Sequence, residues 1–287
     1  MDIVILGSAG QIGAYLKDYL IQKGHEVTGV DIIDGVQNDL RVTPNTYVES
    51  TIKKADFVFF LAFDVGGSRY LKKYQHTFEF INNNTRMMAN TFKLLKKYNK
   101  RFVFASSQMS NMSYSPYGVM KRVGELHTTA LKGLIVKFWN VYGIEKDMEK
   151  AHVITDFIRK GFEEGEFEMM TDGTEERQFL YAEDCCEALE TVMENFTDFK
   201  PEDPLHITSF NSTSIKDVAA IIQGCFNRID RYDVKIKPGL AKDSVQMDKR
   251  NEADMFISSW WLPKTCIDVG IRKVFDSMKK DYIGESK

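Results

Sequence analysis

The chain has 287 residues, 43% of them hydrophobic, so it is long enough to bury one substantial core, with or without a smaller lobe, without disulfides or a metal. Its 38 basic and 41 acidic residues nearly cancel, which excludes a polybasic surface that attracts nucleic acid or an anionic membrane. Four cysteines without a CxxC spacing indicate reduced thiols and a cytoplasmic location. No apolar run reaches about 18 residues and the chain opens directly on a strand, so we expect neither a membrane span nor a signal peptide.

From residue 2 onward, short runs rich in Val, Ile and Phe alternate with longer amphipathic stretches. The runs predict strands at 2–7, 25–31, 56–62, 101–106 and 133–139. The amphipathic stretches predict helices at 11–23, 45–54, 84–99 and 116–131. Strands joined by crossover helices indicate a doubly wound parallel sheet of the α/β class.

The alternation weakens after about residue 145, where we expect a helix near 151–163, a strand at 167–170 and a helix near 182–196. We therefore predict a larger domain built on the sheet over 1–145 and a smaller C-terminal lobe over 146–287, with parts of 180–215 packed on the sheet. No Pro/Gly-rich linker separates the two, so we expect the lobe to pack closely against the sheet.

A glycine turn follows the first predicted strand and opens the first predicted helix. In this setting the Gly-x-x-Gly-x-x-Gly spacing lets the backbone approach a pyrophosphate, which then lies at the positive end of the helix. The expected cofactor contacts of this turn are Gly7, Gly10, Gln11, Ile12 and Gly13.

The second predicted strand ends at Asp31, where a carboxylate can bond both hydroxyls of an adenosine ribose. A phosphate on that ribose would face the carboxylate at ~4 Å, which costs up to about 4 kcal/mol at an effective dielectric constant of about 20. Ile32 and Ile33 supply no cation to reverse this preference. We therefore predict NAD rather than NADP as the cofactor, with Asp39 and Leu40 beside the adenine.

A serine, a tyrosine and a lysine form the predicted proton-transfer set. Ser115 and Pro116 begin a helix that places Tyr117 and Lys121 four residues apart on one face. A lysine ammonium beside a phenol favours phenolate, so we expect Lys121 to lower the pKa of Tyr117. Ser106 and Ser107 end the preceding strand at the carboxyl edge of the sheet, where such sheets bind ligands.

At these residues the chain resembles the extended short-chain dehydrogenase/reductases that act on nucleotide sugars, and the resemblance covers nearly the whole length. It extends to Leu61-Ala62, to Asn84 with Asn90, and to the Asn140–Gly143 segment. The resemblance implies that Ser107, rather than Ser106, orients the reacting hydroxyl, and that Tyr117 and Lys121 also contact the cofactor. It adds further cofactor contacts, namely Leu61, Ala62 and Asn84.

The same resemblance implies a nucleotide-sugar substrate and contacts for it. Arg177 stands where the family has an arginine that holds a diphosphate, and a guanidinium can do so bidentately. Arg250 lies near a C-terminal phosphate contact of the family. The remaining implied substrate contacts are Gly66, Ser107 and Asn140.

Within the family, the Phe63–Gly67 segment resembles the glycine loop of GDP-mannose 3,5-epimerase, and the segment at His152 resembles GDP-fucose synthase. The cysteine that follows the serine pair in those enzymes is absent, because Gln108 and Met109 follow Ser107. The Asp-Glu pair of the 4,6-dehydratases is absent at the same place.

We therefore interpret the chain as an NAD-dependent epimerase that oxidises a sugar carbon transiently, with a GDP-linked hexose favoured. The alternatives are a dehydrogenase or a 4-ketoreductase of the same family; a 4,6-dehydratase and a cofactor-sensing protein without activity are further possibilities. Proton transfer beside the transient ketone is expected from His152 or Lys150, two residues apart and so unable to reach one carbon together. The family also implies a homodimer formed through the helices at 84–99 and 116–131.

Overall fold

A computed structural model describes residues 1–230, 232–243 and 252–283. Its centre is a six-stranded sheet in the order β2-β1-β3-β4-β5-β9, in which every neighbouring pair is parallel. The strands are β1 (Asp2–Leu6), β2 (Glu26–Val30), β3 (Phe57–Phe60), β4 (Arg101–Ser107), β5 (Leu134–Phe138) and β9 (Leu205–Ile207). The predicted doubly wound α/β sheet is therefore confirmed.

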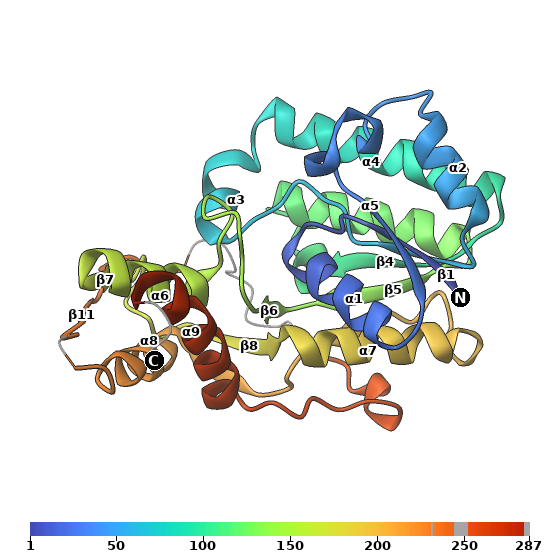
Figure 1. Ribbon diagram of the computed structural model, residues 1–287. Coiled ribbons are helices and arrows are strands. Elements are labelled where there is room, and N and C mark those ends of the chain that lie inside the picture. The colour runs from blue at the N-terminus through green and yellow to red at the C-terminus, as the bar shows by residue number, and fades with distance from the viewer. Residues whose placement is uncertain (231, 244–251, 284–287) are drawn as a thin grey trace.

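Helices cover both faces of this sheet (Figure 1). One face carries α2 (Thr46–Lys54), α4 (Phe78–Lys97) and α5 (Pro116–Ala130), and the other carries α1 (Gln11–Gln22) and α7 (Ala182–Glu194). Alternate residues of a strand point to opposite faces of the sheet and pack into two separate cores. Val4 and Leu6 pack toward the α4 side, whereas Ile3 and Ile5 pack toward α1 and α7. Burial on both faces explains why the strands read as continuous apolar runs.

A second lobe lies beyond the carboxyl ends of the strands (Figure 1). It contains α6 (Val153–Glu164), α8 (Ile215–Phe226) and α9 (Ile267–Ile283), packed around a core of their own. A pair of short strands, β7 (Glu166–Glu168) and β11 (Lys235–Lys237), flanks them. A three-stranded sheet joins the lobe to the domain, and it consists of β6 (Asn140–Tyr142), β8 (Glu176–Tyr181) and β10 (Ser212–Ser214).

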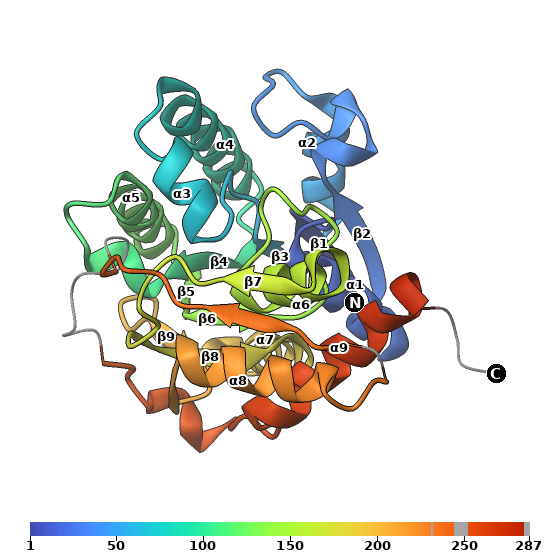
Figure 2. The same ribbon diagram turned by 90° about the vertical axis from the view of Figure 1, so that its left-hand side faces the viewer.

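The structure adds elements that the sequence patterns did not predict. The helix expected at 84–99 begins at Phe78, because the Thr77 hydroxyl caps it by accepting from the amide of Phe80 at 3.2 Å. A separate short helix, α3 (Ser68–Tyr74), precedes it, and β8 was not expected as a strand. In Figure 2, α3 lies beside α4 and α5, on the side of the molecule that faces the lobe.

Across the described ranges, none of the helices combines the length and the apolar character that a membrane crossing requires. Within the same residues, no cluster of three or more His, Cys, Asp or Glu side chains is suited to hold a metal ion.

Candidate active site

The glycine turn between β1 and α1 has no room for side chains. Gly7 adopts a φ of +88°, and a Cβ there would lie 2.7 Å from the Cα of Ala62. A Cβ on Gly13 would lie 2.0 Å from the carbonyl oxygen of Gly7. Gly10 caps α1 without a side chain, and the buried Nε2 of Gln11 has no hydrogen-bond partner among the described residues. A close-packed turn, an open helix N-terminus and an unpaired donor fit a dinucleotide pyrophosphate.

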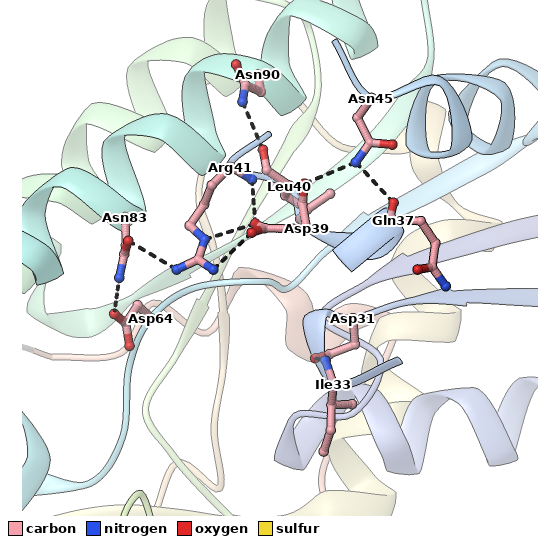
Figure 3. Close-up of polar contacts among 10 residues, drawn as sticks. All are labelled: Asp31, Ile33, Gln37, Asp39, Leu40, Arg41, Asn45, Asp64, Asn83 and Asn90. Atoms are coloured by element: carbon pink, nitrogen blue, oxygen red, sulfur yellow. Dashed lines mark hydrogen bonds and ion pairs between the residues drawn. The ribbon is translucent and has the colours of Figure 1, made fainter. Parts of the chain in front are cut away.

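Asp31 lies directly beside this turn. One carboxylate oxygen accepts from the amide of Ala9 at 3.0 Å, and the other accepts from the amide of Ile33 at 3.2 Å. Figure 3 shows Asp31 beside Ile33. Each oxygen keeps a lone pair for a further donor, as a ribose diol requires. Ile32 and Ile33 are exposed, and neither carries a charge. The residues of this turn and strand end thus fit NAD.

Asp39 and Leu40 lie at the edge of the same region but are engaged with protein groups (Figure 3). Arg41 donates to both carboxylate oxygens of Asp39 at 2.9 Å, and this guanidinium lowers the pKa of Asp39. The carbonyl oxygen of Leu40 accepts from the Asn90 side chain at 3.0 Å. Any contact of the Asp39 carboxylate with adenine would therefore share that carboxylate with Arg41.

Leu61 and Ala62 follow β3, and the Leu61 amide still bonds the carbonyl of Leu6 at 2.9 Å. Asn84 is fully buried on α4, and its side chain holds the loop that follows Ala62. Its Oδ1 accepts from the amide of Asp64 at 2.7 Å, and its Nδ2 donates to the carbonyl oxygens of Asp64 and Phe80. Asn84 thus fixes the loop that follows β3, a role that the sequence did not predict.

The structure brings Ser107, Tyr117 and Lys121 together at the carboxyl end of β4. Ser115 caps α5 by accepting from the amide of Gly118 at 3.2 Å, which directs Tyr117 inward from the first turn. Tyr117 is hydrogen-bonded to the side chain of Ser107. The Nζ of Lys121 donates to the carbonyl oxygen of Ala105 at 2.6 Å.

The electrostatics of this set differ from the expectation. Burial raises the pKa of Tyr117 to about 12, although the hydrogen bond with Ser107 opposes the rise. Burial also lowers the pKa of Lys121 to about 7, against the opposing charge of Glu125. Desolvation of both groups therefore outweighs the expected lowering of the tyrosine pKa by the lysine.

A segment from Phe63 to Tyr74, the covering segment, packs over this set. Phe63 contacts the ring of Tyr117 edge to face at 5.7 Å, and Leu71 joins Tyr117 in one buried cluster. Beneath it, Met109 of the short turn after Ser107 is buried as well. The link from Ser107 to Tyr117 is short, and the covering segment occupies the space above it.

Lys150 and His152 lie where the lobe meets the covering segment. The amide of Gly67 donates to the carbonyl oxygen of Lys150 at 2.9 Å, and the Nζ of Lys150 lies 3.7 Å from an oxygen of Asp64. His152 pairs through Nδ1 with Glu145 at 2.6 Å. Sequence reasoning missed Glu145, for which the only signal was an acidic residue in the same connection after Gly143.

The predicted substrate contacts come from different elements: Gly66 from the covering segment, Asn140 from β6 and Arg177 from β8. A Cβ on Gly66 would lie 3.0 Å from the Cα of Lys150, so the loop needs glycine there. The Oδ1 of Asn140 is buried and has no partner within the described ranges. Arg177 is held by the carbonyl of Glu176 at 2.7 Å and by an ion pair with Asp243. Arg250 lies outside the described residues.

This fold and site define an NAD-binding enzyme in which Ser107, Tyr117 and Lys121 lie together at the carboxyl end of β4. The chain belongs to the NAD dependent epimerase/dehydratase family, whose sequence pattern matches residues 3–207.

The comparisons also find individual relatives. A UDP-N-acetyl-alpha-D-glucosaminuronate decarboxylase of Bacillus cytotoxicus is 27% identical over 255 residues, which are 75% of this chain and 77% of that protein. A GDP-L-fucose synthase of Sinorhizobium fredii is 28% identical over 145 residues, 48% of this chain and 44% of that protein. A mutant UDP-glucuronic acid 4-epimerase from Bacillus cereus, solved with UDP-4-deoxy-4-fluoro-glucuronic acid and NAD, has a similar fold. Its TM-score is 0.80 at 19% identity, over 98% of this chain and all of that one.

Proposed function

We propose that the protein is an NAD-dependent nucleotide-sugar epimerase that oxidises one sugar hydroxyl transiently and reduces the carbon again. The observation that carries this proposal is the convergence of Ser107, Tyr117 and Lys121: Ser107 ends β4, Tyr117 lies buried in the first turn of α5, and Lys121 one turn further on donates to the β4 carbonyl of Ala105. NAD, held by the glycine turn and Asp31, would supply the hydride acceptor for the oxidation and the hydride donor for the reduction. An epimerase of this kind needs no external oxidant.

Residues of the chain provide proton transfer, substrate orientation and cofactor binding. The hydroxyl of Ser107 orients the sugar hydroxyl, and Tyr117 removes its proton as the carbon is oxidised. Lys121, with a pKa of about 7, can take up a proton near neutral pH and stabilise the phenolate when it forms. The turn at Gly7, Gly10 and Gly13 holds the pyrophosphate of the cofactor, and Asp31 holds its ribose.

We propose a GDP-linked hexose as the substrate, because the covering segment and the segment at His152 resemble the GDP-sugar enzymes. Asn140, with its unpaired buried oxygen, and Arg177 are the proposed contacts for the nucleotide sugar. Arg177 would exchange its ion pair with Asp243 for the diphosphate. Because one relative acts on a UDP-sugar, UDP-linked hexoses are the substrates to test beside GDP-linked hexoses.

The experiment incubates the purified protein with NAD and, in parallel, with GDP- and UDP-linked hexoses, and follows products by NMR and NADH by absorbance. We expect an epimerised GDP-hexose without net NADH. Stoichiometric NADH with a keto sugar would instead identify a dehydrogenase, and consumption of supplied NADH with a 4-keto sugar would identify a ketoreductase.

We also propose a homodimer through α4 and α5, which lie side by side (Figures 1 and 2). Val119, Val123 and Leu126 form an exposed apolar stripe on α5, at the spacing of one helix face. Phe78 and Ile81 expose further apolar surface on α4. Light scattering at micromolar concentration should give twice the chain mass; a monomer would refute the dimer.

The cytoplasm is the proposed compartment. All four cysteines, at positions 185, 186, 225 and 266, are free thiols, and three of them are buried. Free thiols are the usual state in a reducing compartment. Fractionation of cells that produce the protein tests this location.

A further inference from the structure

His152 and Glu145 form a hydrogen-bonded pair in the connection between β6 and α6. The Nδ1 of His152 lies 2.6 Å from one carboxylate oxygen of Glu145, and the backbone amide of His152 donates to the other at 2.8 Å. The Glu145 carboxylate thus contacts both the ring and the backbone of His152. Only 7% of the Glu145 side chain is exposed, against 36% of the His152 side chain. These contacts leave the second ring nitrogen, Nε2, to act on another molecule.

The pair lies against the segment that covers Tyr117. A Cβ on Gly67 would lie 3.2 Å from the Cα of His152, so the two backbones are in close contact. Four residues earlier in the same segment, Phe63 contacts the ring of Tyr117. On the other side, the hydroxyl of Thr155 donates to the carbonyl of Gly143 at 3.0 Å and anchors the start of α6. His152 therefore borders the covered site on its lobe side.

Lys150, the other candidate for proton transfer, has a different environment. The carboxylate of Asp64 that faces its ammonium also accepts from the hydroxyl of Tyr70 at 2.5 Å and from the side chain of Asn83 at 3.1 Å. Figure 3 shows this carboxylate at the end of a chain of polar contacts that runs through Asn83 to Arg41. Lys150 is thus one of several partners of a shared carboxylate, which suits a structural ion pair.

Two neighbouring carboxylates, those of Asp156 and Glu149, have partners other than His152. On α3, Arg69 forms an ion pair with Asp156 of α6 at 3.0 Å. Glu149 accepts from the hydroxyl of Tyr74 at 2.7 Å. Burial lowers the pKa of His152, but the charge of Glu145 and its hydrogen bond outweigh this and raise the pKa above its ordinary value. Glu145 is the carboxylate that acts on the ring.

We propose that Glu145 is a positioning residue that orients His152 and keeps it protonated, so that Nε2 serves as the proton donor of the epimerisation. This inference rests on the proposed epimerase function. In the step, the enolate beside the transient ketone takes the proton from Nε2: the N–H bond breaks and the enolate electron pair forms the new C–H bond. The proton that this carbon lost earlier has passed to water. The neutral imidazole then recovers a proton from water at its exposed side.

The first measurement follows the His152 ring by NMR titration, with His152→Asn used to assign its signal. Glu145→Gln keeps an acceptor for Nδ1 but removes the charge, so the pKa of His152 should fall by about one unit or more. The matched control is Glu149→Gln, which removes a carboxylate from the same connection and should leave that pKa unchanged. A His152 pKa that does not respond to Glu145→Gln would overturn the proposal.

The second measurement uses turnover in heavy water. Glu145→Ala, which removes both charge and orientation, should slow deuterium incorporation at carbon at least about tenfold while NAD affinity stays within about twofold. Glu145→Gln should restore part of this rate and move the falling alkaline limb of the rate profile to lower pH. Unchanged incorporation and an unchanged profile would overturn the positioning role. A wild-type protein that turns over no nucleotide sugar would refute the proposed function instead, and the ring titration would still decide whether Glu145 holds His152 protonated.

Discussion

The Nζ of Lys121 lies 3.7 Å from the centroid of the Phe63 ring. An aromatic ring and a carbonyl oxygen, that of Ala105, are the close partners of this buried amine. Neither carries a full negative charge, so desolvation dominates and the pKa of Lys121 falls to about 7. The lysine of the proton-transfer set is thus tuned by the covering segment and by burial together.

This environment makes stability depend on pH. The folded pKa of Lys121 is about 7 and its ordinary value is 10.5, so between these values the folded protein binds fewer protons than the unfolded chain. The cost of burying the amine is therefore full below pH 7 and is relieved as the pH rises. Relative to Lys121→Met, the wild type should gain about 1.4 kcal/mol per pH unit between pH 7 and 9. Urea unfolding of both proteins across this range checks the gain, and parallel curves would contradict it.

Tyr117→Phe should reduce turnover by about 10²–10⁴-fold, because it removes the group that exchanges a proton with the sugar hydroxyl. Cofactor affinity should change little, since the ring and its contact with Phe63 remain. Steady-state kinetics and NAD titration calorimetry measure the two effects. Tyr114→Phe, a half-exposed tyrosine just before α5, is the control and should retain activity. More than about a tenth of wild-type turnover in Tyr117→Phe would exclude Tyr117 as the base.

Asp31→Asn should weaken NAD binding and narrow the preference for NAD over NADP by at least about tenfold. The charge that repels a 2′-phosphate is removed, while an amide oxygen can still accept from Ala9. Calorimetric titration of both cofactors gives the ratio. Asp34→Asn alters a carboxylate three residues further on and should leave the ratio as it is. Tighter binding of NADP than NAD to the wild type would invalidate the argument.

Turnover in heavy water separates the two candidates for proton transfer. We expect a GDP-hexose or its 4-keto form to incorporate deuterium at carbon, and His152→Asn to suppress this more than Lys150→Ala. Lys150 is a partner of the Asp64 carboxylate, so its loss should act mainly on substrate KM through the covering segment. If an active enzyme gave unlabelled product, neither His152 nor Lys150 would transfer a proton to carbon. Inversion would then take place at the oxidised carbon itself, with Tyr117 and NAD sufficient for it.

Gly13→Ala should destabilise the protein by about 1–3 kcal/mol or more and impair cofactor binding. The added methyl group would lie 2.0 Å from the carbonyl oxygen of Gly7, so the turn must move. Gly224→Ala is the matched control in α8, where a Cβ meets nothing within 4 Å. It should be neutral or stabilise the protein by up to about 1 kcal/mol. Chemical denaturation of both variants measures the difference.

The central sheet could be predicted from sequence because its strands are buried on both faces. Phe57–Phe60 illustrates this: all four residues are fully buried, so the run carries a strong signal of its own. Ser68–Tyr74 carries none, because only Leu71 of this short helix is buried. Its position depends on partners distant in sequence, among them Asp156. Such an element is stabilised by tertiary contacts rather than by its own pattern.

The site divides in the same way. Ser107, Tyr117 and Lys121 could be placed together, because the end of a strand and the first turn of the next helix meet at one edge of the sheet. Their pKa values could not, since these depend on how deeply the covering segment buries them. The contact between Glu145 and His152 could not be predicted from the sequence either, because it requires the turn after β6 to fold back on itself.

The covering segment and the 145–156 stretch of the lobe are matched to each other, so we expect that a chimaera must exchange both together. Contacts of Lys150 with Gly67 and Asp64, of Glu149 with Tyr74, and of Asp156 with Arg69 join the two stretches. A chimaera that imports a relative's lobe stretch alone would place foreign side chains opposite these partners and lose the fit. Specificity should therefore transfer between relatives only when both stretches are exchanged together, although some seventy residues separate them in the chain.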